Sequence, residues 1–275
     1  MIETNPVSGT DAPQKPPLPQ GRTVPAGDGM KWTSEAFAIF KASPLMWIIF
    51  MICYMVASLA VAMVPFVGQL LLSLVSPMIM AGVMVGCRAI QNGDQMEIDH
   101  LTSGFSGKKT NPLLMLGAFY LGVTMLLVIV AVVLVIALVG TAALMNPEAL
   151  APETIGISMI LSVLLVILIV MALALPLMMA YWFAVPLIQF HDMDAIQALK
   201  LSFKACLKNI VPFLVYGVAM LVVYLATALP LILSIFTLGP LIILGSLVTF
   251  GLMVLVAVPV TFASIYTSYK GVFEE

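Results

Sequence analysis

Six long runs of apolar residues, with no Asp, Glu, Lys or Arg in their interiors, constrain this chain more than any other feature. About 20 apolar residues cross a bilayer as a helix, which satisfies its own backbone hydrogen bonds in lipid. With 62% hydrophobic residues, the chain is too apolar for an ordinary soluble domain. We predict an all-α integral membrane protein. The six transmembrane helices are expected at about 45–64, 67–88, 113–144, 155–188, 212–236 and 239–266.

Two of these runs, 113–144 and 155–188, are longer than a hydrocarbon core of about 30 Å requires at about 1.5 Å per residue. We therefore expect them to tilt, to bend or to project from the membrane. The first run follows a polar lead that has no charged n-region and no cleavage site. The span at 45–64 is thus expected to be retained as an anchor.

The eleven basic residues fall only at the two ends and in every second connection. The connections at 65–68, 145–153 and 237–240 contain none. Because Lys and Arg accumulate in cytoplasmic loops, we predict a multi-pass protein of the bacterial inner membrane with both termini in the cytoplasm. The basic residues are Lys15, Arg22, Lys31, Lys41, Arg88, Lys108, Lys109, Lys200, Lys204, Lys208 and Lys270.

The first 32 residues differ in composition from the rest of the chain. They are rich in proline and lack apolar periodicity, as in DAPQKPPLPQ at 11–20. We predict a disordered cytoplasmic tail at 1–32. A six-span membrane domain at 33–270 and a short cytoplasmic C-terminus at 271–275 are expected to follow.

A short amphipathic segment precedes each odd-numbered span, at 33–44, 97–112 and 194–212. We expect these segments to lie in the cytoplasmic membrane interface. The third has the clearest pattern, because its large apolar residues fall on one helical stripe beside three lysines. Its predicted apolar stripe is Ile196, Leu199, Phe203, Leu207 and Ile210. The candidate contacts for membrane lipid or for a protein partner are Lys200, Phe203, Lys204 and Lys208.

Three even-numbered spans share a proline followed three and four residues later by Met or Phe and by Ala. The simplest account is three parallel pseudo-repeats, each an interfacial segment followed by a hairpin of two spans. The alternative is coincidence among residues that are common in membrane helices. The matching triplets are Pro77–Met80–Ala81, Pro176–Met179–Ala180 and Pro259–Phe262–Ala263.

Each of these prolines leaves one carbonyl without its helical donor. Pro77 and Pro259 each precede a basic residue by eleven positions, which places them about 16 Å from the cytoplasmic boundary. We therefore predict a shared layer of kinks that serves packing or encloses a small cavity. Its candidate residues are Pro77, Met80, Pro176, Met179, Pro259 and Phe262.

Gly82 and Gly86 form a G-x-x-x-G pair at the end of the second span. Such a pair allows two helices to approach closely. We expect a packing contact here, either within the fold or between two protomers.

The interiors of the spans contain no Asp, Glu, Lys or Arg of the kind that marks a proton relay or an ion path. His100 and His191 stand beside acidic residues, but a metal site would need both imidazoles and a carboxylate together. No nucleophile–base pair and no phosphate loop is present. We predict a protein that is not an enzyme and has no cofactor, no metal and no nucleic-acid partner.

Two stretches carry a family resemblance: GCRAIQNGDQMEIDHLTSGF at 86–105 and YWFAVPLIQFHDMDAIQALKLSFKACLKNIVPFLVYG at 181–217. They resemble a group of six-span proteobacterial inner-membrane proteins without an assigned activity. More loosely, the chain is similar to the membrane domain fused to some bacterial glycerophosphodiester phosphodiesterases. It lacks the phosphodiesterase domain, so the resemblance implies a membrane location and a topology but no activity.

The basic, amphipathic and aromatic residues concentrate on one side of the predicted membrane. We therefore expect an interaction or membrane-organising protein that contacts lipid, a protein partner or a second copy at the cytoplasmic face. The alternative is a transporter or channel for a neutral or amphiphilic solute, built around the proline kinks.

Overall fold

The computed structural model describes residues 19–64, 67–140, 157–236 and 241–275. These residues form helices and no strand. The helices are α1 (Asp28–Ala42), α2 (Pro44–Ala62), α3 (Val67–Gln91), α4 (Ile98–Thr102), η1 (Ser103–Phe105), η2 (Gly107–Lys109), α5 (Thr110–Val135), η3 (Ile136–Gly140), α7 (Ile157–Trp182), α8 (Ala184–His191), α9 (Ala195–Lys208), α10 (Ile210–Ile235), α11 (Leu241–Leu252), η6 (Met253–Ala257) and α12 (Val258–Phe273).

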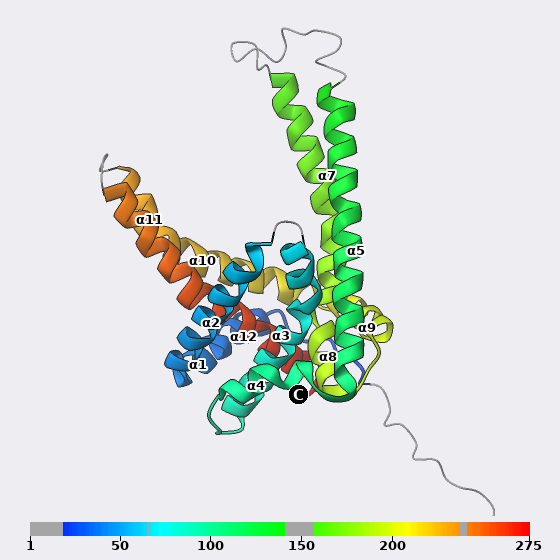
Figure 1. Cartoon of the computed structure of the whole chain (residues 1–275), viewed down its shortest axis with the longest axis vertical. Coiled ribbons are helices and arrows are strands. Elements are labelled where there is room, and N and C mark those ends of the chain that lie inside the picture. Colours follow the sequence, from blue (N-terminus) through cyan, green and yellow to red (C-terminus); the bar gives the residue numbers. More distant parts are fainter. Residues whose placement is uncertain (1–18, 65–66, 141–156, 237–240) are drawn as a thin grey trace, which may run out of the picture.

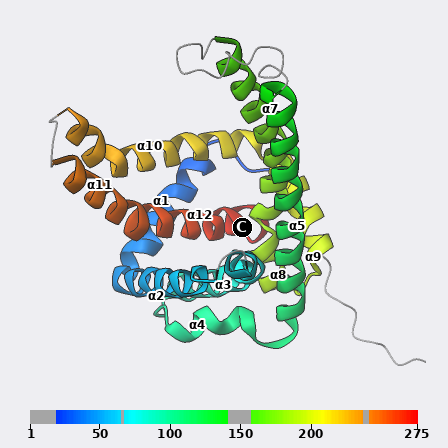
Figure 2. The same ribbon diagram turned by 45° about the horizontal axis from the view of Figure 1, so that its top comes forward.

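Six segments of the described chain are long and apolar enough to cross a membrane, which confirms the predicted fold class. They pair into three hairpins: α2 with α3, α5 with α7, and α10 with the segment formed by α11, η6 and α12. Two of the hairpins diverge from a common base (Figures 1 and 2). The six segments are Pro44–Ala62, Val67–Gln91, Gly107–Leu138, Ile160–His191, Ile210–Ile235 and Leu241–Phe273.

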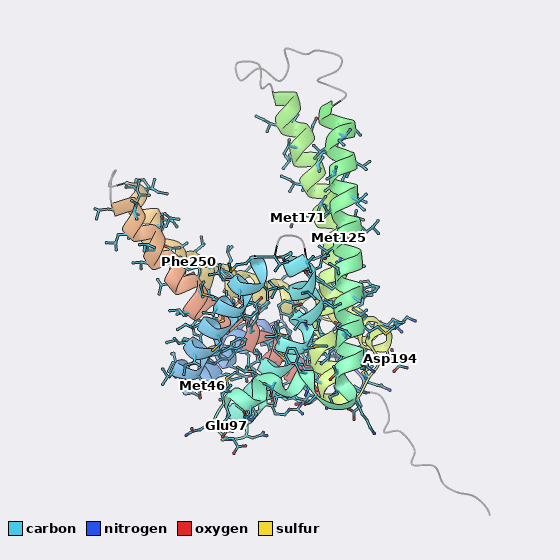
Figure 3. The ribbon with its side chains drawn as sticks, viewed as in Figure 1. Met46, Glu97, Met125, Met171, Asp194 and Phe250 are labelled. Carbon is cyan, nitrogen blue, oxygen red and sulfur yellow. The ribbon has the colours of Figure 1, made fainter. Side chains whose placement is uncertain are left out.

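Most of the buried side chains gather at the base of the hairpins, in a region that we call the hub. The hub consists of residues 19–42, 77–109, 183–209 and 258–275. The arms beyond it expose large apolar side chains: Met125, Met171 and Phe250 are 45%, 64% and 56% exposed and lie on the arms in Figure 3. Such arms suit a lipid environment, since apolar side chains there do not contact water.

Each of the three amphipathic segments packs on the returning helix of a hairpin. Helix α4 packs on α3, and α9 packs on α7. Helix α1 packs on α12, where the Thr267 hydroxyl donates a hydrogen bond of 2.8 Å to the Trp32 carbonyl. The first segment thereby joins the last hairpin, and the hub closes as a ring. The threefold sequence repeat itself stays a prediction.

The predicted boundary of the N-terminal tail needs correction. Helix α1 begins at Asp28, and residues 19–27 pack on the hub. The Asn209 side chain accepts a hydrogen bond from the Val24 amide and donates one to the Arg22 carbonyl, each at 2.9 Å. Trp32, at 1% exposure, anchors the start of α1. Residues 1–18 of the predicted tail lie outside the described residues.

The two chain ends of the described structure meet in the hub. The Arg22 amide donates to the Val272 carbonyl at 3.0 Å, and the Arg22 Nε donates to the Gly271 carbonyl at 2.8 Å. Both ends therefore lie on one side of the six membrane-crossing segments, as an even number of spans requires. Which side of the membrane this is stays a prediction.

The predicted fourth span does not run unbroken to 188. Helix α7 ends at Trp182, and α8 begins at Ala184. Pro186 has no N–H to donate to the Trp182 carbonyl four residues earlier, and the helix breaks there. The 141–144 end of the third predicted span and the 155–156 start of the fourth lie outside the described residues.

Prolines also shape the second and sixth spans. The Ser76 hydroxyl donates at 3.0 Å to the Ser73 carbonyl, which Pro77 leaves without a helical donor. In the sixth span, the π-helical turn η6 ends at Ala257, two residues before Pro259. Both adjustments keep the helix continuous around a proline.

Candidate functional site

Helix α9 begins at a side-chain cap and packs on α7 through small residues. The Asp194 carboxylate accepts a hydrogen bond of 2.9 Å from the Gln197 amide, a cap typical of Asp at the start of a helix. The Ser202 hydroxyl and the Cys206 thiol both donate to the Met179 carbonyl, at 2.7 and 3.3 Å. Burial raises the pKa of the Cys206 thiol to about 12, so the thiol stays neutral. The buried face consists of Ala195, Ala198, Leu199, Ser202, Ala205 and Cys206.

The predicted apolar stripe of α9 is therefore not its packing face. Leu199 is buried, but Ile196 is 52% and Leu207 is 46% exposed, and Phe203 is half-buried. Small side chains make the close contact with α7 at Ser202 and Cys206, and of the large apolar residues Ile196, Leu207 and Ile210 project outward. An outward stripe of this kind suits contact with lipid.

The lysines of α9 line one hollow of about 540 Å³ between the helix and residues 19–21. Lys200, Lys204 and Lys208 follow one another at intervals of one helical turn along its wall. The Lys208 ammonium donates to the Gly21 carbonyl at 3.4 Å. Phe203 does not line the hollow. The structure thus brings together three of the four predicted contact residues.

Most other cations of the described chain have acidic partners. Glu275 pairs with Arg22, Lys31 and Lys270, at 3.8, 3.0 and 3.3 Å. The hydrogen bond between Lys31 and Glu275 raises the pKa of the lysine and lowers the pKa of the carboxyl. The other three pairs are Lys31 with Glu35, Arg88 with Glu274 and Lys109 with Asp192.

Five basic residues form no ion pair within the part of the chain that the structure describes, and three of them lie on α9. These five are Lys41, Lys108, Lys200, Lys204 and Lys208. Among the described residues, helix α9 therefore carries the densest group of cations that lack a carboxylate partner.

The six residues of the predicted proline layer do not share one hollow. Pro77 and Met80 line a second pocket, described below. Pro259 is buried in the hub, and Pro176 is exposed on α7. Met179 and Phe262 pack partly buried against the core.

Gly82 and Gly86 make their packing contacts within the fold. A Cβ atom at Gly82 would lie 2.5 Å from the Leu101 carbonyl oxygen, and one at Gly86 would lie 2.8 Å from the Met96 side chain. The close approach expected from the G-x-x-x-G pair is thus one between α3 and residues 96–101.

The two histidines have different partners. The His100 Nδ1 accepts a hydrogen bond of 3.0 Å from the Glu97 amide, whereas the His191 Nε2 lies 2.8 Å from the Tyr269 hydroxyl. Among the described residues, no group of three or more His, Cys, Asp or Glu side chains could hold a metal ion.

Sequence reasoning missed Asn209 and Ser202, both of which are 0% exposed. Asn209 holds residues 22–24 to the end of α9, and Ser202 holds α7 to α9. Asn209 follows the last turn of α9, and Asn favours helix ends and turns over helix interiors. That position was a signal for a helix end. Nothing in the local pattern identified the distant backbone groups that the side chain binds.

A protein of Burkholderia thailandensis named "probable inner membrane protein" is 28% identical to this chain over 268 residues. The match covers 91% of this chain and 92% of that protein. No family model and no solved structure matches the chain. Together with the six apolar segments, this relative supports a multi-pass inner-membrane protein. The looser likeness to the phosphodiesterase-associated membrane domain stays a prediction.

Proposed function

We propose that this protein is a non-enzymatic membrane-organising protein that binds anionic lipid headgroups through α9 at the cytoplasmic face. The observation that carries the proposal is the row of Lys200, Lys204 and Lys208 along one hollow. These cations lack carboxylate partners among the described residues, and each lysine near an anionic surface contributes about 1 kcal/mol to binding.

The outer face of α9 supports a lipid rather than a soluble anion as the ligand. Ile196 and Leu207 are about half exposed beside the lysines. Apolar side chains at this position can enter the acyl-chain boundary while the ammonium groups reach phosphates. A soluble anion would use the charges and leave the apolar stripe in water.

The test is binding of phosphatidylglycerol and phosphatidylcholine to the purified full chain in mild detergent, followed by native mass spectrometry. The double variant K200Q/K204Q should lose affinity for phosphatidylglycerol about tenfold or more, since two contributions of about 1 kcal/mol are removed. Binding of the zwitterionic lipid should change little.

The matched control is K41Q/K108Q, which removes the same charge from two other lysines without ion pairs. Its affinity for phosphatidylglycerol should equal that of the unmodified chain. Equal losses in the two double variants would mean that net charge, and not α9, attracts the lipid. Deletion of α9 is a poorer test, because Ser202 and Cys206 hold the Met179 carbonyl of α7.

The alternative is a transporter or channel for a neutral or amphiphilic solute. This alternative rests on the predicted layer of proline kinks. Of the residues in that layer, Pro77 and Met80 line a pocket. Pro176 is exposed and Pro259 is buried elsewhere, so the geometry supports this alternative less than the α9 surface.

A further inference from the structure

A second pocket, separate from the lysine hollow, lies where the α5–α7 hairpin joins the hub. Its volume is about 380 Å³, within the range of small-molecule sites. Pro77 and Met80 of α3, Leu127 of α5, Leu177 of α7 and Ile265 of α12 line it. No charged side chain lines it.

The pocket reaches the outer surface of the helices. Met178 belongs to its lining and is 58% exposed. Leu175, a neighbour of Met178 on α7, is 59% exposed. Because this surface is one of the apolar arms, an occupant would enter from surrounding lipid rather than from water.

One buried hydroxyl of the pocket lining has no hydrogen-bond partner among the described residues. The Tyr181 hydroxyl oxygen is buried and unpaired, and its ring lies 4.9 Å from the Tyr120 ring. By contrast, the Trp182 Nε1 donates to the Ser268 hydroxyl at 3.0 Å, and the Ser76 hydroxyl donates within α3. A buried hydroxyl without a partner costs free energy, so a bound acceptor would remove that cost.

The aromatic residues indicate which part of a lipid the pocket suits. Tyr120, Tyr181 and Trp182 come together at its wall, and Tyr and Trp combine an apolar ring with a polar tip. Such side chains suit the boundary between an acyl chain and its ester group, where one end is apolar and the other is polar.

We propose that this pocket binds one membrane phospholipid, with an acyl chain in the apolar hollow and an ester carbonyl accepting the hydrogen bond of Tyr181. The apolar lining suits the acyl chain, and the exposed rim gives access from the bilayer. The unpaired hydroxyl favours a ligand that carries a hydrogen-bond acceptor. The site is independent of the lysine surface of α9.

The test uses the fluorescence of Trp182 in the full chain, purified in mild detergent and titrated with phosphatidylethanolamine that carries brominated acyl chains. Bromine quenches tryptophan on contact. Trp32 and Trp47 are 1% and 0% exposed, so quenching should come from Trp182, and W182F should abolish it. We expect quenching that saturates at one lipid per chain.

Two variants of α7 separate the pocket from the general lipid-facing surface. Ala174 lines the pocket, whereas Ala172 is exposed outside it. A174F should fill the hollow and remove the saturable quenching, whereas A172F should retain it. Equal quenching in the two variants would overturn the proposal.

The hydroxyl is tested by Y181F, which keeps the ring. Its lipid affinity should fall about three- to tenfold, the effect of one hydrogen bond, while its thermal stability without lipid should not fall, because no bond in the fold is lost. Unchanged affinity would overturn the assigned role of Tyr181. K200Q/K204Q should retain the quenching, so failure of the α9 proposal and failure of this one are distinguishable.

Discussion

At Gly82 the backbone of α3 lies against the backbone of α4. A Cβ atom there would stand 2.5 Å from the Leu101 carbonyl oxygen and 2.6 Å from its Cα. Because backbone atoms cannot move aside as a flexible side chain can, G82A should lower the free energy of unfolding by about 1–3 kcal/mol. The measurement is thermal unfolding of the purified chain in detergent.

The control is G122A on α5, where a new Cβ atom would meet nothing within 4 Å. This change replaces a helical glycine with alanine, so stability should hold or rise by up to about 1 kcal/mol. A destabilisation of the same size in both variants would contradict a specific contact at Gly82.

The contact of a residue could be predicted from the sequence where its partner lies nearby in the chain. The Asp194 cap binds a group three residues away, and the pattern at Gly82 and Gly86 correctly indicated close packing. The partner of Gly82 on α4 was not predictable. Asn209 was missed for the same reason, because its contact with Val24 joins residues 185 positions apart.

At the scale of the element, the packing of α9 on α7 depends on Ser202. Its hydroxyl accepts a hydrogen bond of 2.9 Å from the Phe183 amide and donates one of 2.7 Å to the Met179 carbonyl. S202A should leave the buried amide without a partner and lower the free energy of unfolding by about 1–3 kcal/mol. Thermal unfolding in detergent measures the change.

Ser34 provides the comparison, because its exposed hydroxyl bonds only to the Lys31 carbonyl of its own helix. S34A should change stability by less than about 0.5 kcal/mol. If S34A and S202A unfold at the same temperature, the bonds between α9 and α7 contribute nothing measurable.

The periodicity of the sequence predicted that α9 is an amphipathic helix, but it did not predict which face of the helix is buried. A hydrophobic stripe marks a packing face in a soluble protein, whereas beside a membrane the same stripe can face lipid. The sequence alone could not separate these cases, because Ser202 and Cys206 contact α7 through small side chains that a hydrophobic stripe does not include. The break at Phe183 was likewise hidden inside an unbroken apolar run.

At the scale of the whole molecule, the six spans were predictable because hydropathy is a local sum over about 20 residues. The divergence of the hairpins and the ring-like closure of the hub were not. They depend on contacts such as the bond between Thr267 and Trp32, 235 positions apart.

The orientation of the molecule gives a further prediction. The test uses a background in which Cys53 is replaced by alanine and adds one of two new cysteines. Q95C lies on the hub side, and E148C lies between the third and fourth spans. Each variant is treated with a membrane-impermeant maleimide. E148C should react in intact spheroplasts, whereas Q95C should react only after lysis, because we expect the basic hub side to face the cytoplasm. The reverse pattern would place the hub outside the cytoplasm.

The ring of the hub also determines when the molecule can finish folding. Synthesis proceeds from the N-terminus, so α1 emerges long before α12, on which it packs. Trp32, almost fully buried in the finished hub, must wait for Thr267 to leave the ribosome. Until then the amphipathic α1 has the membrane surface as its available apolar surroundings. Chain elongation thus orders the assembly: the hairpins enter the bilayer first, and the hub closes last.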